Sequence, residues 1–408
     1  MAQSIKTPRL ALTFIIITLT IDAMGIGLIL PVMPALIRDI TGADLGTAAW
    51  WGGWLTTIFA LMQFIFAPIV GSLSDRYGRR PVLLVSLAVV AVDFVIMGLA
   101  HTMWLLVLTR IVGGIATATQ STAAAFIADV STPENKAANF GLIGAAFGAG
   151  FVLGPGIGGL LGDLDPRAPF FAAAALAAVN LVFGYFVLPE TVTEERRRPF
   201  DIWRANPLGA LTAVSKLRGV KRLLIIAFLY EFAFVVYPTV WAFFTQERFG
   251  WSEGMVGLSL SCFGISMAIV QGVLIRLIVP RFGERKTILY GFLFNICIFC
   301  VLAFITNGWI VLALTPITAF GAVVTPALTS LMSQKAADNQ QGELQGVLSS
   351  AKSLAFILSP LAMTQLFFLF TREGGVYMPG APFLLSSVLV AACLYVFVTR
   401  KRRADATA

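Results

Sequence analysis

Twelve apolar segments follow one another along the chain, separated by short stretches of polar or charged residues. Each segment is close to the roughly 20 residues that an α-helix needs to cross a bilayer. Proline or paired glycine interrupts three of them, which bundled membrane helices tolerate because neighbouring groups satisfy the freed backbone. The pattern therefore predicts an all-α membrane protein. Its twelve transmembrane helices are expected at about 10–33, 49–71, 81–100, 104–127, 139–161, 169–188, 223–244, 254–277, 287–305, 309–331, 344–369 and 381–399.

The composition agrees with this pattern. Of the 408 residues, 58% are hydrophobic and only 12% are charged, which is about half of the roughly 25% found in soluble domains. Little chain is left for a soluble domain. The first apolar segment lacks the basic region and small-residue cleavage site of a signal peptide, so we expect it to remain in the protein.

The longest charged interval, residues 189–222, divides the twelve segments into six and six. We therefore expect an N-terminal half at 1–188, a cytoplasmic linker at 189–222 and a C-terminal half at 223–408. The linker is either a solvated tether or a basic segment lying on the anionic inner leaflet. The turn at 75–80 (DRYGRR) is echoed 205 residues later at 280–285 (PRFGER), and internal duplication with a midplane site is typical of secondary transporters.

The net charge of +8 is a topology signal. If both termini are cytoplasmic, 22 of the 29 Lys and Arg residues lie inside, four lie outside and three fall within or beside apolar segments. This asymmetry follows the positive-inside rule. It predicts both termini in the cytoplasm and gives no reason to expect a nucleic-acid partner.

Isolated charges inside the apolar segments are the candidates for function. Asp22 stands alone in the first segment, where insertion of an acid costs about 2.5–3.5 kcal/mol. Asp93 and Arg110 flank a short turn near His101 at similar spacing, and a rise of 1.5 Å per residue puts both at a depth of roughly 12–14 Å. They can pair in a hairpin, either as a structural pair or as part of the transport site.

The turn after the second segment reads GSLSDRYGRRPVLL, residues 71–84. Its glycines allow close helix approach and a tight turn, and Asp75 can face the positive end of a helix N-terminus. Arg79 or Arg80 can pair with Asp129, which closes the fourth segment on the same side. The arginines could instead serve only as topology anchors.

This stretch resembles the signature loop of the major facilitator superfamily. RIVGGIATA (110–118), GPGIGG (154–159) and LPET (188–191) extend the likeness, which is greatest to the tetracycline/proton antiporters and runs through most of the chain. The resemblance implies the major facilitator fold of two six-helix halves, an inside gate and a rocking hinge. The implied gate residues are Asp75, Arg76, Arg79, Arg80 and Asp129, and the implied hinge residues are Gly154, Pro155, Gly158 and Gly159.

The resemblance also implies substrate or proton handling by the intramembrane charges, and it matches Gln63 to a polar cavity residue, although an ordinary interhelical hydrogen bond would serve equally well there. The family's second-half His and Asp are replaced here by Met267 and Asn295. Glu231 and Lys352 lie near mid-depth instead, and they can pair, or Glu231 can be the relocated proton site because an apolar cavity favours a protonated carboxylate. We expect proton coupling at Asp22, Asp93 and Glu231. We expect substrate binding at Asp22, Gln63, Asp93, Arg110, Glu231, Asn295 and Lys352.

The predicted function is a proton-coupled antiporter that exports amphipathic organic compounds, with tetracycline-like drugs as the leading substrate. The alternative is export of an endogenous metabolite or a siderophore-like compound. A membrane enzyme is disfavoured because His101, the single histidine, has no local acid cluster. We expect no cofactor or metal, since the Cys297/Cys300 pair reads as apolar filling in a membrane segment. We expect a monomer in the bacterial inner membrane, with a small-molecule substrate, protons and lipid as partners.

Overall fold

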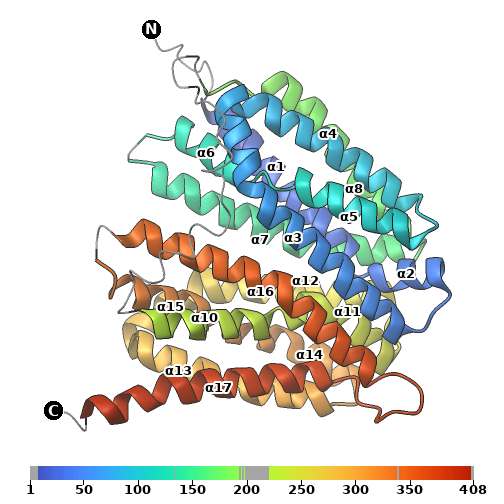
Figure 1. Ribbon diagram of the computed structural model, residues 1–408, viewed down its shortest axis with the longest axis vertical. Helices are drawn as coiled ribbons and strands as arrows, with labels where there is room; N and C mark the ends of the chain where they lie inside the picture. Colours follow the sequence, from blue (N-terminus) through green and yellow to red (C-terminus); the bar gives the residue numbers. More distant parts are fainter. Residues whose placement is uncertain are drawn as a thin grey trace. The chain divides into compact units, whose positions relative to one another are not determined.

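A computed structural model describes residues 8–132, 134–192, 194, 197, 220–337 and 340–405, and the secondary structure in these ranges is helical throughout. Long runs of apolar residues satisfy their backbone groups inside the helix, which is the solution that a bilayer imposes. The described residues before the central charged interval form eight helices, which Figure 1 labels along the chain. They are α1 (Pro8–Ile29), α2 (Met33–Thr41), α3 (Leu45–Tyr77), α4 (Arg79–Gly98), α5 (Met103–Ala116), α6 (Gln120–Val130), α7 (Lys136–Gly162) and α8 (Ala168–Val187).

The helices after the central interval include two short segments of other helical types. A π-helical segment, η3, joins α12 to α13, and a 3-10 segment, η4, joins α14 to α15. The elements are α10 (Lys221–Phe234), α11 (Val236–Phe249), α12 (Glu253–Ile269), η3 (Val270–Leu274), α13 (Ile275–Phe304), α14 (Gly308–Thr318), η4 (Ala319–Val323), α15 (Val324–Ser333), α16 (Gln341–Leu369) and α17 (Ala381–Asp405).

The described residues contain 11 helical stretches that are long and apolar enough to cross a membrane. One of them, Glu253–Phe304, has 52 residues, which at 1.5 Å per residue is far longer than the roughly 30 Å of a bilayer core. Gly283 breaks this stretch with φ 74° and ψ 157°. The stretch therefore provides two crossings, and the prediction of twelve transmembrane helices in an all-α fold is confirmed.

The chain divides into two compact units that do not coincide with the two predicted halves. The first unit contains Met1–Gly42, Ile58–Pro207 and Glu253–Ser261, and the second contains Ala43–Thr57, Leu208–Ser252 and Cys262–Ala408. Helices α3 and α12 thus each contribute residues to both units. The predicted linker at 189–222 lies largely outside the described residues, and its role stays a prediction.

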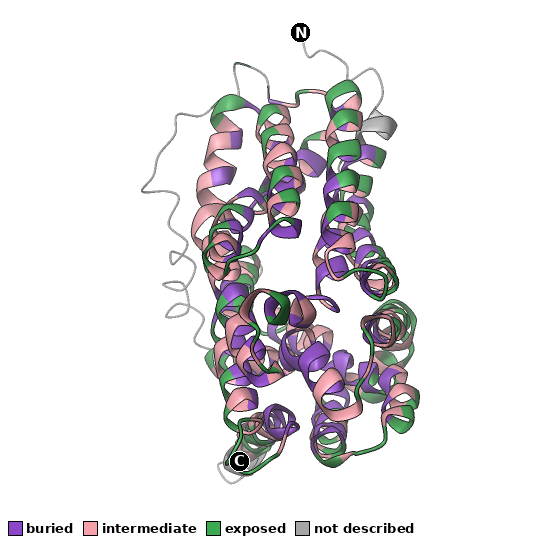
Figure 2. Cartoon of the chain, turned by 90° about the vertical axis from the view of Figure 1, so that its right-hand side faces the viewer, coloured by how far each residue is buried: buried purple, intermediate pink, exposed green. Residues whose placement is uncertain are grey.

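Most helices mix buried and exposed positions along their length (Figure 2). Many of the exposed side chains are large and apolar, including Phe186 on α8 at 78% exposure and Leu160 on α7 at 68%. Apolar side chains in such numbers on the surface indicate a face that contacts other apolar groups. In a protein built from membrane-length helices, that face is the lipid-facing surface.

Arg167, at the start of α8, ties three elements of the first unit together. Its Nη1 donates to the carbonyl oxygens of Gly98 and Ala100 at the end of α4, at 2.8 Å each. Its Nη2 lies 2.7 Å from the Asp39 carboxylate on α2 and 3.4 Å from Nδ1 of His101. The guanidinium therefore closes the end of α4 and fixes α2 and the α4–α5 turn beside it.

Candidate functional site

Asp22 lies in the middle of α1, and its side chain is partly exposed. It borders a small cavity inside the first unit whose other walls come from α1, α4 and the junction of α5 with α6. Within the described ranges the carboxylate has neither a hydrogen bond nor an ion pair to the protein. The cavity is lined by Thr18, Asp22, Leu83, Ser86, Leu87, Val90, Ala116, Thr117 and Thr119.

Asp93 and Arg110 form a buried ion pair. Arg110 Nη2 lies 3.5 Å from Asp93 Oδ2, and the two residues are only 8% and 5% exposed. The guanidinium also contacts the sulfur of Met97 and lies over the ring of Phe59, with its central carbon 5.3 Å from the ring centroid. The hairpin geometry expected from helix rise is thus present.

A glycine on α5 makes this pair possible. A Cβ atom added to Gly113 would lie 2.6 Å from Asp93 Oδ2, well inside van der Waals contact. The stretch RIVGG therefore provides both the cation, Arg110, and, at Gly113, the space that the Asp93 side chain occupies. The Nε of Arg110 is buried and has no hydrogen-bond partner in the described structure, so the guanidinium is incompletely satisfied by Asp93 alone.

Gln63 on α3 reaches the same region. Its Nε2 donates to the carbonyl oxygen of Thr117 at 3.4 Å, beside the cavity that Asp22 borders. This is the interhelical hydrogen bond that the sequence allowed as one of two roles. It also puts a polar side chain next to the interruption between α5 and α6.

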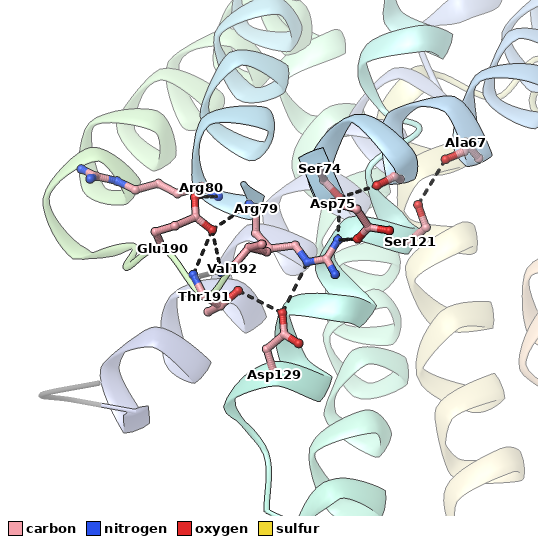
Figure 3. A network of polar contacts seen from close by, with 11 residues as sticks. Ala67, Ser74, Asp75, Arg79, Arg80, Ser121, Asp129, Glu190, Thr191 and Val192 are labelled. Carbon is pink, nitrogen blue, oxygen red and sulfur yellow. Dashed lines mark hydrogen bonds and ion pairs between the residues drawn. The ribbon is translucent and has the colours of Figure 1, made fainter. Parts of the chain in front are cut away.

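Arg79 is the centre of a polar network at the α3–α4 turn (Figure 3). Its Nη1 lies 2.5 Å from Asp75 Oδ1 and 2.7 Å from the Ser74 hydroxyl, and its Nε lies 3.4 Å from Asp129 at the end of α6. The same Asp129 oxygen accepts from the Thr191 hydroxyl at 3.0 Å. Asp75, Arg79 and Asp129 therefore meet as predicted.

Glu190 is a member of this network that sequence reasoning missed. Its carboxylate accepts hydrogen bonds from the backbone amides of Arg79 and Arg80 at 2.9 and 3.3 Å (Figure 3). These amides open α4, so Glu190 and not Asp75 caps the positive end of that helix. The sequence feature that could have predicted this cap is the acidic third residue of LPET.

The two other predicted gate arginines point elsewhere. Arg80 donates through Nη2 to the carbonyl oxygen of Tyr185 at 2.7 Å. Arg76 lies over the ring of its neighbour Tyr77, with its central carbon 5.1 Å from the centroid. Neither has an ion pair in the described part of the chain. Arg79 is thus the arginine that joins α3, α4 and α6.

The second unit repeats the turn with different chemistry. Gly78 and Gly283, 205 residues apart, both have positive φ, at 107° and 74°. At the position equivalent to Arg79, Glu284 accepts from Gln334 Nε2 at 2.7 Å and from the Ser330 hydroxyl at 3.3 Å. Hydrogen bonds from its own backbone amide and from Gln334 lower the pKa of Glu284. Gln334 lies 205 residues after Asp129, so a carboxylate–amide contact replaces the ion pair.

The predicted hinge residues hold α7 against its neighbours without a break. Helix α7 continues through Pro155. A Cβ atom on Gly154 would lie 2.6 Å from the carbonyl oxygen of Met24, and one on Gly158 would overlap the backbone of Leu28. Gly159 faces the first residues of α12 with the same lack of space. These glycines therefore set close backbone contact of α7 with α1 and α12.

Glu231 and Lys352 do not pair in the second unit. Glu231 Oε1 accepts from the Thr325 hydroxyl at 2.8 Å. Lys352 is exposed, and its ammonium lies 6.0 Å from the ring centroid of Phe356. The pairing considered from the sequence is wrong, because equal depth does not fix the faces on which two helices present their side chains.

Asn295 is fully buried in the packing of the second unit. Its Nδ2 donates to the carbonyl oxygen of Gly291 at 2.8 Å, and it lies 3.3 Å from the hydroxyl of Tyr230 and from the carbonyl oxygen of Gly321. These contacts join α13, α10 and η4. The residue has no exposed surface, and its predicted role in substrate binding remains untested.

Several aromatic residues and Cys300 belong to the packing of the second unit as well, whereas Cys297 is exposed. Tyr237 and Trp241 are 3% and 2% exposed and lie among other rings, with Tyr237 5.1 Å from the ring of Phe263. Cys300 contacts the Ser387 hydroxyl at 3.2 Å. Within the described residues, His, Cys, Asp and Glu form no group of three that could hold a metal ion.

Comparison with known proteins decides the family. The model of the Major Facilitator Superfamily matches residues 15–360 and 223–406. The chain belongs to this superfamily. It is 41% identical over 357 residues to the class C tetracycline resistance protein of Escherichia coli, covering 88% of this chain and 89% of that one. It is 38% identical over 374 residues to the class G protein of Vibrio anguillarum, covering 92% and 93%.

A solved structure agrees with the fold of the superfamily. A variant of the nucleoside transporter NupG aligns with a TM-score of 0.77 at 13% identity, covering 96% of this chain and 99% of that one. At this identity the likeness concerns the fold alone. Together with the membrane-length helices, it makes this member of the major facilitator superfamily a multi-pass membrane protein.

Proposed function

We propose that this chain exports tetracycline-like amphipathic drugs in exchange for protons. Relatives that it matches over about nine-tenths of their length are tetracycline resistance proteins. The observation that carries the proposal is Asp22, a carboxylate inside a membrane helix that borders a cavity and has no protein partner in the described structure. Ionisable residues in such positions typically serve ion or substrate pathways.

The three intramembrane acids support different parts of an exchange cycle. Among the described residues Asp22 has no partner, whereas Asp93 is held by Arg110 and Glu231 accepts a hydroxyl hydrogen bond. In the proposed cycle, protons from outside neutralise these carboxylates and the drug leaves outward. Reorientation then releases the protons inside. Substrate and protons compete for the same acids, so occupancy by one expels the other.

The polar network around Arg79 supports a gate on the cytoplasmic side. It joins α3, α4, α6 and the segment after α8 through charged contacts that are partly open to solvent. Each such ion pair contributes little free energy. A gate held closed by these contacts can therefore open in every transport cycle. We place both termini and this network inside the cell, in the inner membrane, and we expect a monomer to suffice.

Export of an endogenous metabolite or siderophore-like compound is the weaker alternative. The relatives are named for drug resistance, and this does not favour a metabolite. The position that holds an acid in the second half of the tetracycline exporters is Asn295 here, and an amide cannot serve as a proton carrier. The candidate proton sites are therefore Asp22, Asp93 and Glu231.

Everted membrane vesicles from an efflux-deficient host test the proposal. Tetracycline added to wild-type vesicles that hold a proton gradient should release protons and be accumulated. Asp22→Asn should abolish both signals, whereas Asp44→Asn, at an exposed position outside α1, should keep them. Wild-type vesicles that ignore tetracycline would refute the substrate class. Full proton flux in Asp22→Asn would remove Asp22 from the cycle.

A further inference from the structure

The fourth membrane crossing is interrupted beside Asp22. Helix α5 ends at Ala116 and α6 begins at Gln120, with Thr117, Ala118 and Thr119 between them. The backbone resumes its helical bonds only when the amide of Ala123 reaches the carbonyl of Thr119. The first amides of α6 therefore lack intrahelical partners. Interrupted helices in transporters commonly bring such backbone groups to an ion site.

The cavity at this interruption has an unusual set of polar walls. Thr18 and Thr117 already donate their hydroxyls, to Phe14 and Gly113. In contrast, the hydroxyls of Ser86 and Thr119 have no partner among the described residues, and neither does the Asp22 carboxylate. Thr119 is only 7% exposed. Three polar groups without protein partners thus share one cavity, which has room for about one water molecule.

A water molecule fits this chemistry better than an apolar ligand does. Buried water typically makes about three hydrogen bonds to polar groups that lack other partners, and leaving such groups unbonded is costly. A hydroxyl can donate or accept. Ser86 and Thr119 can therefore hold the same water whether it donates to an ionised Asp22 or accepts from a protonated one.

We propose that Ser86, Thr119 and Asp22 bind a water molecule through which Asp22 exchanges its proton. In the release step, the carboxyl O–H bond of Asp22 breaks and its proton bonds to this water. The water passes a different proton to bulk water, so its own composition is restored. The reverse sequence loads Asp22. This inference rests on the proposed function, because it assigns a path to the proton that the exchange requires.

The other two acids lack this arrangement. The carboxylate of Asp93 is closed off by Arg110 and by α5 at Gly113. Glu231 has the Thr325 hydroxyl as its direct partner. Asp22 is therefore the acid at which a bridging water has both a place and two further protein partners.

Purified protein in liposomes can test the relay with tetracycline as the probe. Two rates are compared, tetracycline-driven proton flux and tetracycline–tetracycline exchange at equal pH, which needs no net proton movement. Removing both hydroxyls with Ser86→Ala and Thr119→Val should lower the ratio of flux to exchange about tenfold, as expected when a proton path loses its hydrogen-bonding partners. Thr119→Ser keeps a hydroxyl and should keep the ratio.

Thr20→Val is the matched control. Thr20 lies two residues before Asp22 on α1, but its hydroxyl is bonded to the carbonyl of Ile16 and does not line the cavity. If the double variant folds poorly, Ser86→Ala alone should still lower the ratio severalfold, since Ser86 is only partly buried.

The outcomes separate the two proposals. Loss of flux in Asp22→Asn together with a wild-type ratio in the double variant would overturn the relay and leave the proposed function standing. Full flux in Asp22→Asn would remove Asp22 from the cycle and overturn the relay with it, whereas wild-type liposomes without tetracycline-driven proton flux would overturn the proposed function itself. If a sodium gradient at equal pH drives tetracycline transport and the double variant abolishes that drive, the cavity binds sodium and the relay is wrong.

Discussion

Replacing Asp93 by asparagine should destabilise the protein strongly, because it leaves the charge of Arg110 buried without a counter-ion. The two side chains are 3.5 Å apart and are 10% and 5% exposed. At an effective dielectric constant of about 20, charges at that distance attract each other by about 5 kcal/mol. Part of this attraction offsets desolvation, and removing one partner of a buried pair typically costs about 3–5 kcal/mol.

A surface pair in the same unit provides the comparison. Arg167 and Asp39 are closer, at 2.7 Å, but the Asp39 side chain is 59% exposed. Exposed pairs contribute about 1 kcal/mol or less. Asp39→Asn should therefore cost much less than Asp93→Asn although its ion pair is shorter, because burial outweighs distance here.

Urea unfolding in detergent micelles measures these differences. The double variant Asp93→Asn with Arg110→Gln removes both charges and should regain most of the stability lost by Asp93→Asn, since a neutral pair carries no uncompensated charge. Transport by the double variant then separates the two roles that the sequence left open. Restored stability without tetracycline-driven proton flux would show that the pair serves transport and not structure alone.

Equal stability of Asp93→Asn and the wild type, within about 0.5 kcal/mol, would refute this reasoning, because surface substitutions away from any special contact have effects of that size. A cost of Asp39→Asn as large as that of Asp93→Asn would refute it as well. In that case burial would not be the quantity that sets the strength of these pairs.

Three further perturbations follow from the geometry. Glu190→Ala removes the cap of α4 and should cost about 1 kcal/mol in urea unfolding, whereas a change below about 0.3 kcal/mol would contradict the capping role. Gly158→Leu should prevent α7 from packing on α1 at Leu28, so well-folded protein should be lost in gel filtration, and a monodisperse, active variant would contradict this packing. Thr325→Val removes the hydroxyl that donates to Glu231 and should lower tetracycline-driven proton flux, and Thr325→Ser should restore it, whereas equal flux in all three proteins would exclude a role for this contact in the cycle.

The membrane helices were predictable because the bilayer fixes their length and composition. The twelve predicted segments are identified from apolar runs alone. The structure differs from this prediction mainly because it contains the additional short helix α2 and because four of the crossings are interrupted. Helix α2 has Pro34 in its first turn and ends at Gly42, whose φ is 65°. It is too short to carry a transmembrane signal, so the pattern of apolar segments does not predict it.

Contacts within one hairpin were predictable as well, whereas contacts between distant elements were not. The Asp93–Arg110 pair follows from helix rise along two segments joined by a short turn. The bond from Glu190 to the amides of α4 joins residues 111 positions apart, and no local spacing encodes it. Glu231 and Lys352 share a depth, but the rotation of each helix about its own axis decides which side chains meet.

The interruption of the fourth crossing gave little warning in the sequence. The stretch 117–122 (TATQST) contains no proline or glycine, although five of its six residues are polar. Threonine is only mildly unfavourable in helices, so its presence does not predict a break. The break became visible only through the backbone, together with the cavity that it borders.

The arginine at the start of α8 makes the single imidazole of this protein a natural spectroscopic reporter. Because Arg167 can only donate hydrogen bonds, its contact with Nδ1 of His101 requires that nitrogen to be unprotonated. Nitrogen-15 labelling of histidine would thus give one resonance pair, free of overlap, whose tautomer reveals whether the guanidinium stays docked. Each change at the α4–α5 turn during turnover could then be followed without introducing any foreign label.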